Sequence, residues 1–313
     1  MIRFRSFSKR YGPHRAVDAL TFDVHAGEIV ALLGPNGSGK TTSIKAAAGL
    51  IRPSLGDVLL GEPGRPATDP DARRISSFLP QKVSFPESLS GREVVEFYRA
   101  LRRAARGRTD AVLRFASLNG AGDRLVGTYS GGMVQRLGLA VAMLPEAPIL
   151  LLDEPTAALD PDGLCAFYEL LEQRKRAGAT VFFSSHQMGD VERLADRFAI
   201  LVEGRLAAAF TQRELSAQLA DRGVMRVRVD GRPAGLLERV QAISPSARWA
   251  ADELIVPGPA SARPAMLDLV RGAGVEIRRL TAEEGRLDEF YRELVGEETT
   301  TERTRNERGT NTE

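Results

Sequence analysis

Nine consecutive residues, 34–42, combine three glycines with a lysine and two threonines. They follow the apolar run 29–33 and precede an alanine-rich segment, 43–50, which predicts a buried strand, a glycine-rich turn and a helix in that order. The glycines allow successive backbone N–H groups to point at an anion, and the beginning of the helix adds partial positive charge. The turn is therefore predicted to bind phosphate groups. Its residues are Gly34, Pro35, Asn36, Gly37, Ser38, Gly39, Lys40, Thr41 and Thr42.

Two side chains near the end of this turn extend the prediction from phosphate to a nucleotide. Lys40 supplies a full positive charge for β and γ phosphates, and the hydroxyl of Thr41 is a ligand for Mg²⁺. The alternative, an ordinary glycine-rich turn, does not account for the strand and the helix that flank it. We therefore predict a nucleotide-binding loop.

Two adjacent carboxylates follow another apolar run. Residues 149–152 predict a buried strand, and Asp153 and Glu154 come directly after it. In sheets of this kind, ligands bind beyond the carboxyl ends of the strands. Because adjacent acids at such a position are costly unless they serve a metal or a water, we expect Asp153 to hold Mg²⁺ and Glu154 to polarise the attacking water.

The pattern of strands and helices predicts the elements that position these residues. Buried strands that alternate with helices indicate an α/β fold with a mainly parallel sheet. The block from about 86 to 140 is nearly all helical, which predicts a helical subdomain inserted in this core. The predicted strands are 2–7, 20–24, 29–33, 149–152, 180–184 and 199–202, and a helix is predicted from 163 to 176.

The pattern changes after about residue 220, which predicts a first domain over 1–220 and a small α+β domain over 222–296. We expect the second to be a dimerising or regulatory module with a βαβαβ-like order. Residues 297–313 have no apolar side chain and are predicted to be a disordered tail. The expected elements of the second domain are strands 224–229, 254–256 and 275–280 and helices 234–243, 265–271 and 287–294.

Composition excludes several classes of protein. The sequence has 43 basic and 41 acidic residues, a net charge of +2, so bulk charge gives no drive toward nucleic acid. Cys165 is the single cysteine, which excludes an internal disulfide and favours a reducing compartment. Because no apolar run reaches the roughly 18 residues that span a bilayer, we expect any membrane-spanning part to come from another chain.

The segment Tyr129-Ser130-Gly131-Gly132-Met133 opens a predicted helix and resembles the signature motif of ATP-binding cassette (ABC) ATPases. The phosphate loop, this helix start and the Asp-Glu strand end come in that family's order, and the resemblance covers residues 1 to about 215. It implies a P-loop NTPase core with an antiparallel β subdomain. The family's usual glutamine is replaced by Met133, which puts one contact with a partner in doubt.

The resemblance also implies a two-chain site. In this family two cassettes pair head to tail, and each ATP lies between one phosphate loop and the partner's signature helix. Ser130, Gly131 and Gly132 would then bind the γ-phosphate of ATP held by the partner. Both halves of the site are present here, so a homodimer is expected.

Further roles follow only from the resemblance. It assigns Gln81 to Mg²⁺, to water and to coupling with a membrane subunit. It makes His186 the switch histidine that bonds the γ-phosphate and orders Glu154. It places Asp160 in the loop that crosses the dimer interface and stacks Tyr11 on adenine.

Three classes of cassette protein are compatible with these motifs. DNA-repair ATPases of this family carry a long coiled coil, but residues 43–148 show no sustained heptads. Cassette proteins that act on ribosomes usually carry two phosphate loops, and this chain has one. The preferred interpretation is therefore the ATPase subunit of a transporter. It would be cytoplasmic, at the inner face of the membrane through a separate permease, whose coupling helix would dock on residues 81–92.

Within transporters, the chain resembles most the ATPase of the Nos system, which matures the copper sites of nitrous oxide reductase. The cargo would then be sulfur or copper-related. The alternative is a drug, antibiotic or other small exporter, which shares the Tyr-Ser-Gly-Gly-Met form and a C-terminal extension. Three histidines and one cysteine, widely scattered, make no copper cluster in this chain. The phrases that carry the resemblance to the Nos ATPase are 83–85, 89–93, 128–140 and 287–291.

Overall fold

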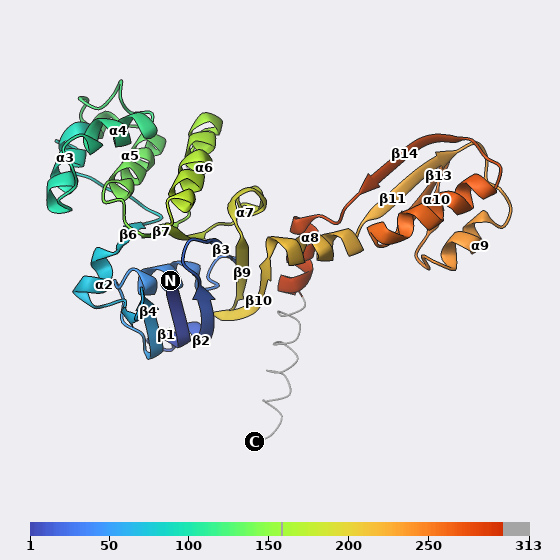
Figure 1. The fold of residues 1–313 in the computed structure, drawn as a ribbon, viewed down its shortest axis with the longest axis horizontal. Helices are drawn as coiled ribbons and strands as arrows, with labels where there is room; N and C mark the ends of the chain where they lie inside the picture. The colour runs from blue at the N-terminus through green and yellow to red at the C-terminus, as the bar shows by residue number, and fades with distance from the viewer. Residues whose placement is uncertain (158, 297–313) are drawn as a thin grey trace, which may run out of the picture. The chain divides into compact units, whose positions relative to one another are not determined.

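The computed structural model describes residues 1–157 and 159–296, which form two compact units that divide between Ala209 and Phe210 (Figure 1). Each unit is described by itself. The predicted domains divide about ten residues later, at 220, and their separate roles stay a prediction. The predicted tail, 297–313, and Ala158 lie outside the described residues.

A six-stranded sheet forms the centre of the first unit, in the order β10-β9-β3-β8-β7-β6. The inner strands β3, β8 and β7 are buried along their whole length and pair in parallel, as their apolar sequences predict. The mainly parallel α/β core is therefore confirmed. The strands are β3 (Ile29–Leu33), β6 (Ser76–Leu79), β7 (Ile149–Asp153), β8 (Thr180–Ser184), β9 (Arg197–Val202) and β10 (Arg205–Thr211).

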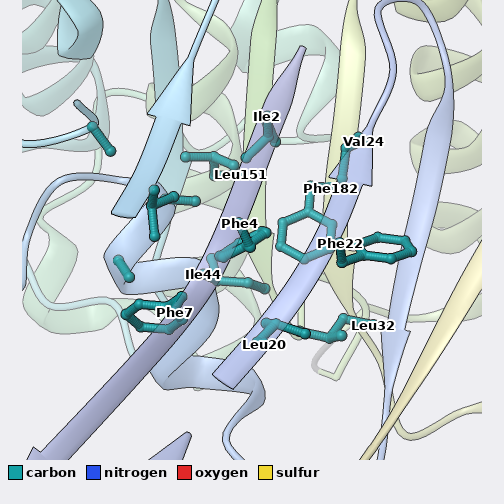
Figure 2. Packing of buried hydrophobic residues seen from close by; sticks show 14 of the residues in the cluster. Ile2, Phe4, Phe7, Leu20, Phe22, Val24, Leu32, Ile44, Leu151 and Phe182 are labelled. Carbon is teal, nitrogen blue, oxygen red and sulfur yellow. The ribbon is translucent and has the colours of Figure 1, made fainter. Parts of the chain in front are cut away.

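An antiparallel sheet of order β2-β1-β4-β5 packs against this core. Its hairpin is longer than the sequence predicts, because both strands run on to a tight turn that pairs Tyr11 with His14. Phe4, fully buried, lies with its ring centre 5.8 Å from that of Phe182 in the parallel sheet (Figure 2). Aromatic and aliphatic side chains from both sheets thus form one core. The strands are β1 (Ile2–Tyr11), β2 (His14–Val24), β4 (Leu55–Leu60) and β5 (Arg65–Pro66).

Three helices make the predicted helical subdomain, and Figure 1 shows them on the opposite side of the central strands from β1 and β2. The first helix begins with a capping box, in which Ser90 accepts from the backbone of Glu93 and Glu93 accepts from that of Ser90. The three are α3 (Gly91–Leu101), α4 (Arg108–Phe115) and α5 (Gly131–Met143). Elsewhere the unit has α1 (Lys40–Ala47), α2 (Pro70–Arg74), α6 (Pro161–Arg176) and α7 (Met188–Leu194).

The second unit contains an α+β fold with an antiparallel sheet, in the order β12-β13-β11-β14. The expected βαβαβ-like order missed one strand, β12, because its three residues carry too little pattern. Met225, Val227 and Val229 alternate toward the helices and form the core with Leu236 and Val270. The elements are α8 (Gln212–Asp221), β11 (Val224–Val229), α9 (Leu236–Gln241), β12 (Arg248–Ala250), β13 (Glu253–Pro257), α10 (Arg263–Gly272), β14 (Ile277–Glu283) and a helix over 287–296.

The shared core predicts a large loss of stability when Phe4 is truncated. Phe4→Ala should lower the free energy of unfolding by about 3–5 kcal/mol, because it leaves a cavity between the two sheets. Urea denaturation of the full chain measures this loss. Phe97→Ala is the control, since that ring is 61% exposed and should cost less than about 1 kcal/mol. Equal losses for the two variants would contradict the shared core.

Candidate active site

The phosphate loop connects β3 to α1, and its shape depends on glycine. Gly34, Gly37 and Gly39 have φ values of 152°, 83° and 101°, a region that side chains rarely adopt. A Cβ at Gly39 would lie 2.5 Å from the carbonyl oxygen of Ala16, whereas one at Gly37 would meet nothing within 4 Å. Gly39 therefore allows β2 to approach the loop closely, and Gly37 serves the turn alone.

Lys40 begins α1 and is 6% exposed. Its Nζ donates to the carbonyl oxygens of Gly34, at 2.7 Å, and Pro35, at 3.0 Å. Burial lowers the pKa of the Lys40 ammonium, and the carboxylates of Glu154 and Asp153 act in the opposite direction. A buried ammonium that donates to two neutral carbonyls is ready to bind a phosphate oxygen, which offers a full opposite charge.

Asp153, fully buried at the end of β7, accepts two hydroxyl hydrogen bonds on one oxygen. Thr41 Oγ1 donates to its Oδ1 at 3.1 Å, and Ser184 Oγ donates to the same atom at 2.7 Å. Burial raises the pKa of the Asp153 carboxyl, while these hydroxyl groups lower it. The buried Oδ2 has no hydrogen-bond partner among the described residues. An unsatisfied carboxylate oxygen beside a threonine hydroxyl suits the hard oxygen shell of Mg²⁺.

Glu154 follows in a left-handed backbone conformation, with φ 49°. Gln81 Nε2 donates to its Oε2 at 2.9 Å, and His186 Nδ1 lies 3.5 Å from the same oxygen. Its backbone N–H donates to Ser184 Oγ at 2.9 Å. The structure thus brings together the three residues that the sequence singles out for catalysis, around one carboxylate.

A cavity of about 320 Å³ joins the phosphate loop to these groups. Residues 36–42, Gln81 and Glu154 line it together with Tyr11, whose ring is 47% exposed. Lys9 Nζ lies 5.2 Å from the centre of the Tyr11 ring. This is enough room for the phosphates of a nucleotide, with one aromatic face open at the rim.

The signature residues lie outside the lining of this cavity. Ser130 is exposed and caps α5, where its Oγ accepts from the backbone N–H of Met133 at 3.3 Å. Gly131 is exposed and Gly132 half-buried, and the first turn holds no acidic residue. Asp160 similarly caps α6 and accepts from the backbone of Gly163 at 2.8 Å. The predicted residues of one chain therefore form two separate sets: those around the phosphate-loop cavity, and those at the beginnings of α5 and α6.

Sequence reasoning missed Ser184, His14 and Ala16. Ser184 connects the backbone of Glu154 to the carboxylate of Asp153, and the other two line the cavity. The signal for Ser184 was its place at the end of a strand that pairs in parallel with β7, opposite Asp153. His14 and Ala16 enter through the hairpin, which no local pattern relates to the loop.

Within residues 1–157 and 159–296, no group of three histidine, cysteine or carboxylate residues forms a ready metal site. In the same part of the chain, no helix has both the length and the apolarity that a bilayer crossing needs.

A glycine-rich loop before a helix, a carboxylate pair at the end of a neighbouring strand and a capped signature helix define a P-loop ATPase of the cassette type. The sequence profile described as "ABC transporter" matches residues 17–157. The chain is 32% identical to the uncharacterized ABC transporter ATP-binding protein YxlF of Bacillus subtilis, over 94% of this chain and 99% of that protein. The chain therefore belongs to the ABC transporter ATP-binding proteins, a family of ATPases coupled to transport.

Two other comparisons bear on its function. The daunorubicin resistance ATP-binding protein DrrA3 of Streptomyces coeruleorubidus is 32% identical, over 93% of this chain and 94% of that protein. A solved structure, the dimeric post-hydrolysis state of the cassette MJ0796 with ADP and Pi, matches at a TM-score of 0.63 and 26% identity. It covers 68% of this chain and 99% of that cassette, which confirms the cassette fold.

The two glycine environments predict different effects on nucleotide binding. Gly39→Ala should weaken ATP affinity at least about tenfold more than Gly37→Ala, because only the first methyl group meets the Ala16 carbonyl. Titration of the full chain with a fluorescent ATP analogue measures both. Since both positions have a left-handed φ, equal effects would mean that backbone strain, and not the approach of β2, shapes the loop.

Proposed function

We propose that this chain is the ATP-hydrolysing subunit of an ABC exporter of small molecules. The observation that carries the ATPase assignment is the Glu154 carboxylate, which Gln81 and His186 hold beside the phosphate-loop cavity. A carboxylate held in this way can accept a proton from a water that attacks the γ-phosphate. The nearby buried ammonium of Lys40 supplies positive charge for the phosphates.

In the proposed reaction, residues of this chain bind the nucleotide and orient the attacking water, and none of them forms a covalent bond with the substrate. Thr41 and Asp153 would hold Mg²⁺, with Gln81 at its water shell. When bound, Mg²⁺ would neutralise charge on the phosphate oxygens. Glu154 would orient the attacking water in line with the bond that breaks. Tyr11 would stack on the adenine ring.

The site is completed by a second copy of the chain in this proposal. Ser130, Gly131 and Gly132 lie at the beginning of α5, where backbone N–H groups can bind an anion, and outside the cavity of their own chain. A head-to-tail homodimer would bring them to the γ-phosphate of the partner's ATP. Asp160 would cross the same interface. The dimeric state of the cassette MJ0796 supports this arrangement.

A separate membrane subunit would supply the permeation path and hold the chain at the cytoplasmic face of the membrane. A groove of about 1140 Å³ supports this part of the proposal. Pro80, Lys82 and Val83 line it on one side and Tyr98 and Leu101 on another. Because the groove begins next to Gln81, a segment docked there would be coupled directly to the residue that holds Glu154.

For the cargo, we favour export of a drug-like or antibiotic-like molecule over the Nos type. DrrA3, named for daunorubicin resistance, aligns along nearly the whole chain, including the second unit. Neither of the two relatives described above has a name tied to nitrous oxide reductase. The phrases that suggest a Nos ATPase are short, whereas this likeness extends over 93% of the sequence.

Glu154→Gln tests the proposed hydrolysis and the dimer together. The amide keeps the size of the carboxylate but cannot accept the proton, so the rate should fall at least about 100-fold. In Mg-ATP the variant should elute at twice the 34.0 kDa mass of the chain. Phosphate release and light scattering measure the two results. Glu169→Gln, on the exposed surface of α6, should match the wild type. Hydrolysis by Glu154→Gln at the wild-type rate would refute the assignment.

The export proposal is tested in the organism that carries the gene, with Lys40→Ala on the chromosome. Loss of the phosphate contact should raise cellular accumulation of daunorubicin or a similar amphipathic antibiotic several-fold and leave nitrous oxide reductase activity unchanged. Lys175→Ala, which removes a part-buried ion pair to Asp196 away from the nucleotide cavity, controls for expression. Unchanged accumulation with loss of the copper enzyme would favour the Nos type.

A further inference from the structure

A buried carboxylate outside the nucleotide cavity is surrounded by three hydroxyl groups. Asp190, 1% exposed, accepts on Oδ2 from Thr156 Oγ1 at 2.6 Å and from Ser185 Oγ at 2.9 Å. Its Oδ1 accepts from Tyr168 Oη at 2.6 Å. All three donors are also buried, between 2% and 7% exposed.

The groups that contact this carboxylate are neutral hydroxyls, and none of the described basic side chains lies within ion-pair distance of it. Among the described residues no ion pair includes Asp190, and the guanidinium of Arg193 lies over the Tyr168 ring, at 5.1 Å. A buried charge is expensive to keep without a cation, so its neutral donors must be held firmly in place. Hydrogen bonds to a charged acceptor are about twice as strong as neutral ones, which makes Asp190 a strong anchor for the segments that donate to it.

Two of the three donors belong to segments that carry the catalytic residues. Thr156 comes two residues after Glu154 and four before Asp160. Ser185 lies between Ser184, which bonds Asp153 and the Glu154 backbone, and His186. The Ser185 hydroxyl also accepts from the backbone N–H of Gln187 at 3.0 Å, so it fixes the chain on the other side of His186.

The third donor, Tyr168, connects the anchor to the body of the unit. It lies on α6, with its ring packed beside the buried Phe167 at 6.2 Å between ring centres. Burial raises the pKa of the Tyr168 hydroxyl, and its hydrogen bond to Asp190 acts in the same direction, so it remains a donor. Asp190 is thereby fixed to the fold on one oxygen and to the two catalytic segments on the other.

We propose that Asp190 is a positioning residue, which holds the strand end that carries Glu154 and the segment that carries His186 in one fixed relation through Thr156 and Ser185. The inference rests on the proposed ATPase function. The backbone N–H of Leu159 donates to the carbonyl oxygen of Thr156 at 3.1 Å, so a displacement of Leu159 when two chains pair would pass through Thr156 and Asp190 to Ser185 and His186. As a consequence, Asp160 would reach the dimer interface at the same time as His186 reaches the γ-phosphate.

Thr156→Val tests this role in the full-length protein with Mg-ATP. Valine has the same shape but cannot donate to Asp190, so kcat should fall about tenfold while KM for ATP changes less than about twofold. Thr156→Ser keeps the hydroxyl and should restore kcat to within about twofold of the wild type. A fall in kcat without a matching rise in KM would show that the variant still binds ATP and that the catalytic groups are misplaced.

Thr109→Val is the control, because the hydroxyl of the buried Thr109 likewise donates to a carboxylate, that of Glu96 in the helical subdomain, away from the site. Both valine variants should lower the midpoint of thermal unfolding, but only Thr156→Val should lower kcat. Equal kcat values for the two, or a Thr156→Val effect on KM alone, would overturn the proposal. Should Thr156→Val fail to fold, Ser185→Ala decides by the same measurements.

Refutation of the role of Asp190 can be told apart from refutation of the proposed ATPase function. If the wild-type chain did not hydrolyse Mg-ATP, the ATPase assignment itself would be wrong. If the wild type hydrolyses ATP and Thr156→Val does so equally well, only the role of Asp190 is refuted.

Discussion

The candidate site depends on the parallel register of three buried strands. β8 pairs with β3 on one side and with β7 on the other, and Ser184 is the Cα partner of both Leu32 and Asp153. Parallel pairing brings the carboxyl ends of all three strands to one edge of the sheet. The phosphate loop, the two carboxylates and the His186 segment leave from that edge and therefore meet. A shift of β8 by one residue would turn Ser184 to the other face.

This geometry gathers charges that the folded chain does not itself neutralise. Lys40 and Asp153 are both buried. Burial lowers the pKa of the Lys40 ammonium and raises that of the Asp153 carboxyl, so it favours the neutral form of each group. Charged groups that are desolvated and incompletely paired oppose folding, and the apolar core around Phe4 and Phe182 offsets this cost. A nucleotide with its metal ion would complete both partnerships, so binding is also expected to stabilise the cassette.

The sequence predicts the strands β3, β7 and β8 and the loops after them, because long apolar runs and glycine clusters are strong local signals. It does not predict β6, whose residues begin with Ser76 and Ser77, nor the antiparallel order of the second unit, because pairing is decided between distant segments. Gln81 could be placed beside Glu154 only through family resemblance. The bonds that Ser184 makes with Glu154 and Asp153, and the bond from Thr156 to Asp190, join residues about 30 positions apart and leave no periodic trace.

The left-handed backbone conformation of Glu154 affects which inactivating substitutions the fold tolerates. A non-glycine residue in that conformation carries strain, which is tolerated where function requires the side chain. Glycine would relieve it, so a single change to glycine would give a protein that folds at least as well and still carries an intact signature helix. If two chains pair as proposed above, a cell that makes both forms would contain mixed dimers of the altered protein with working copies. The defect would then be inherited as dominant, although only one of the two partners is altered.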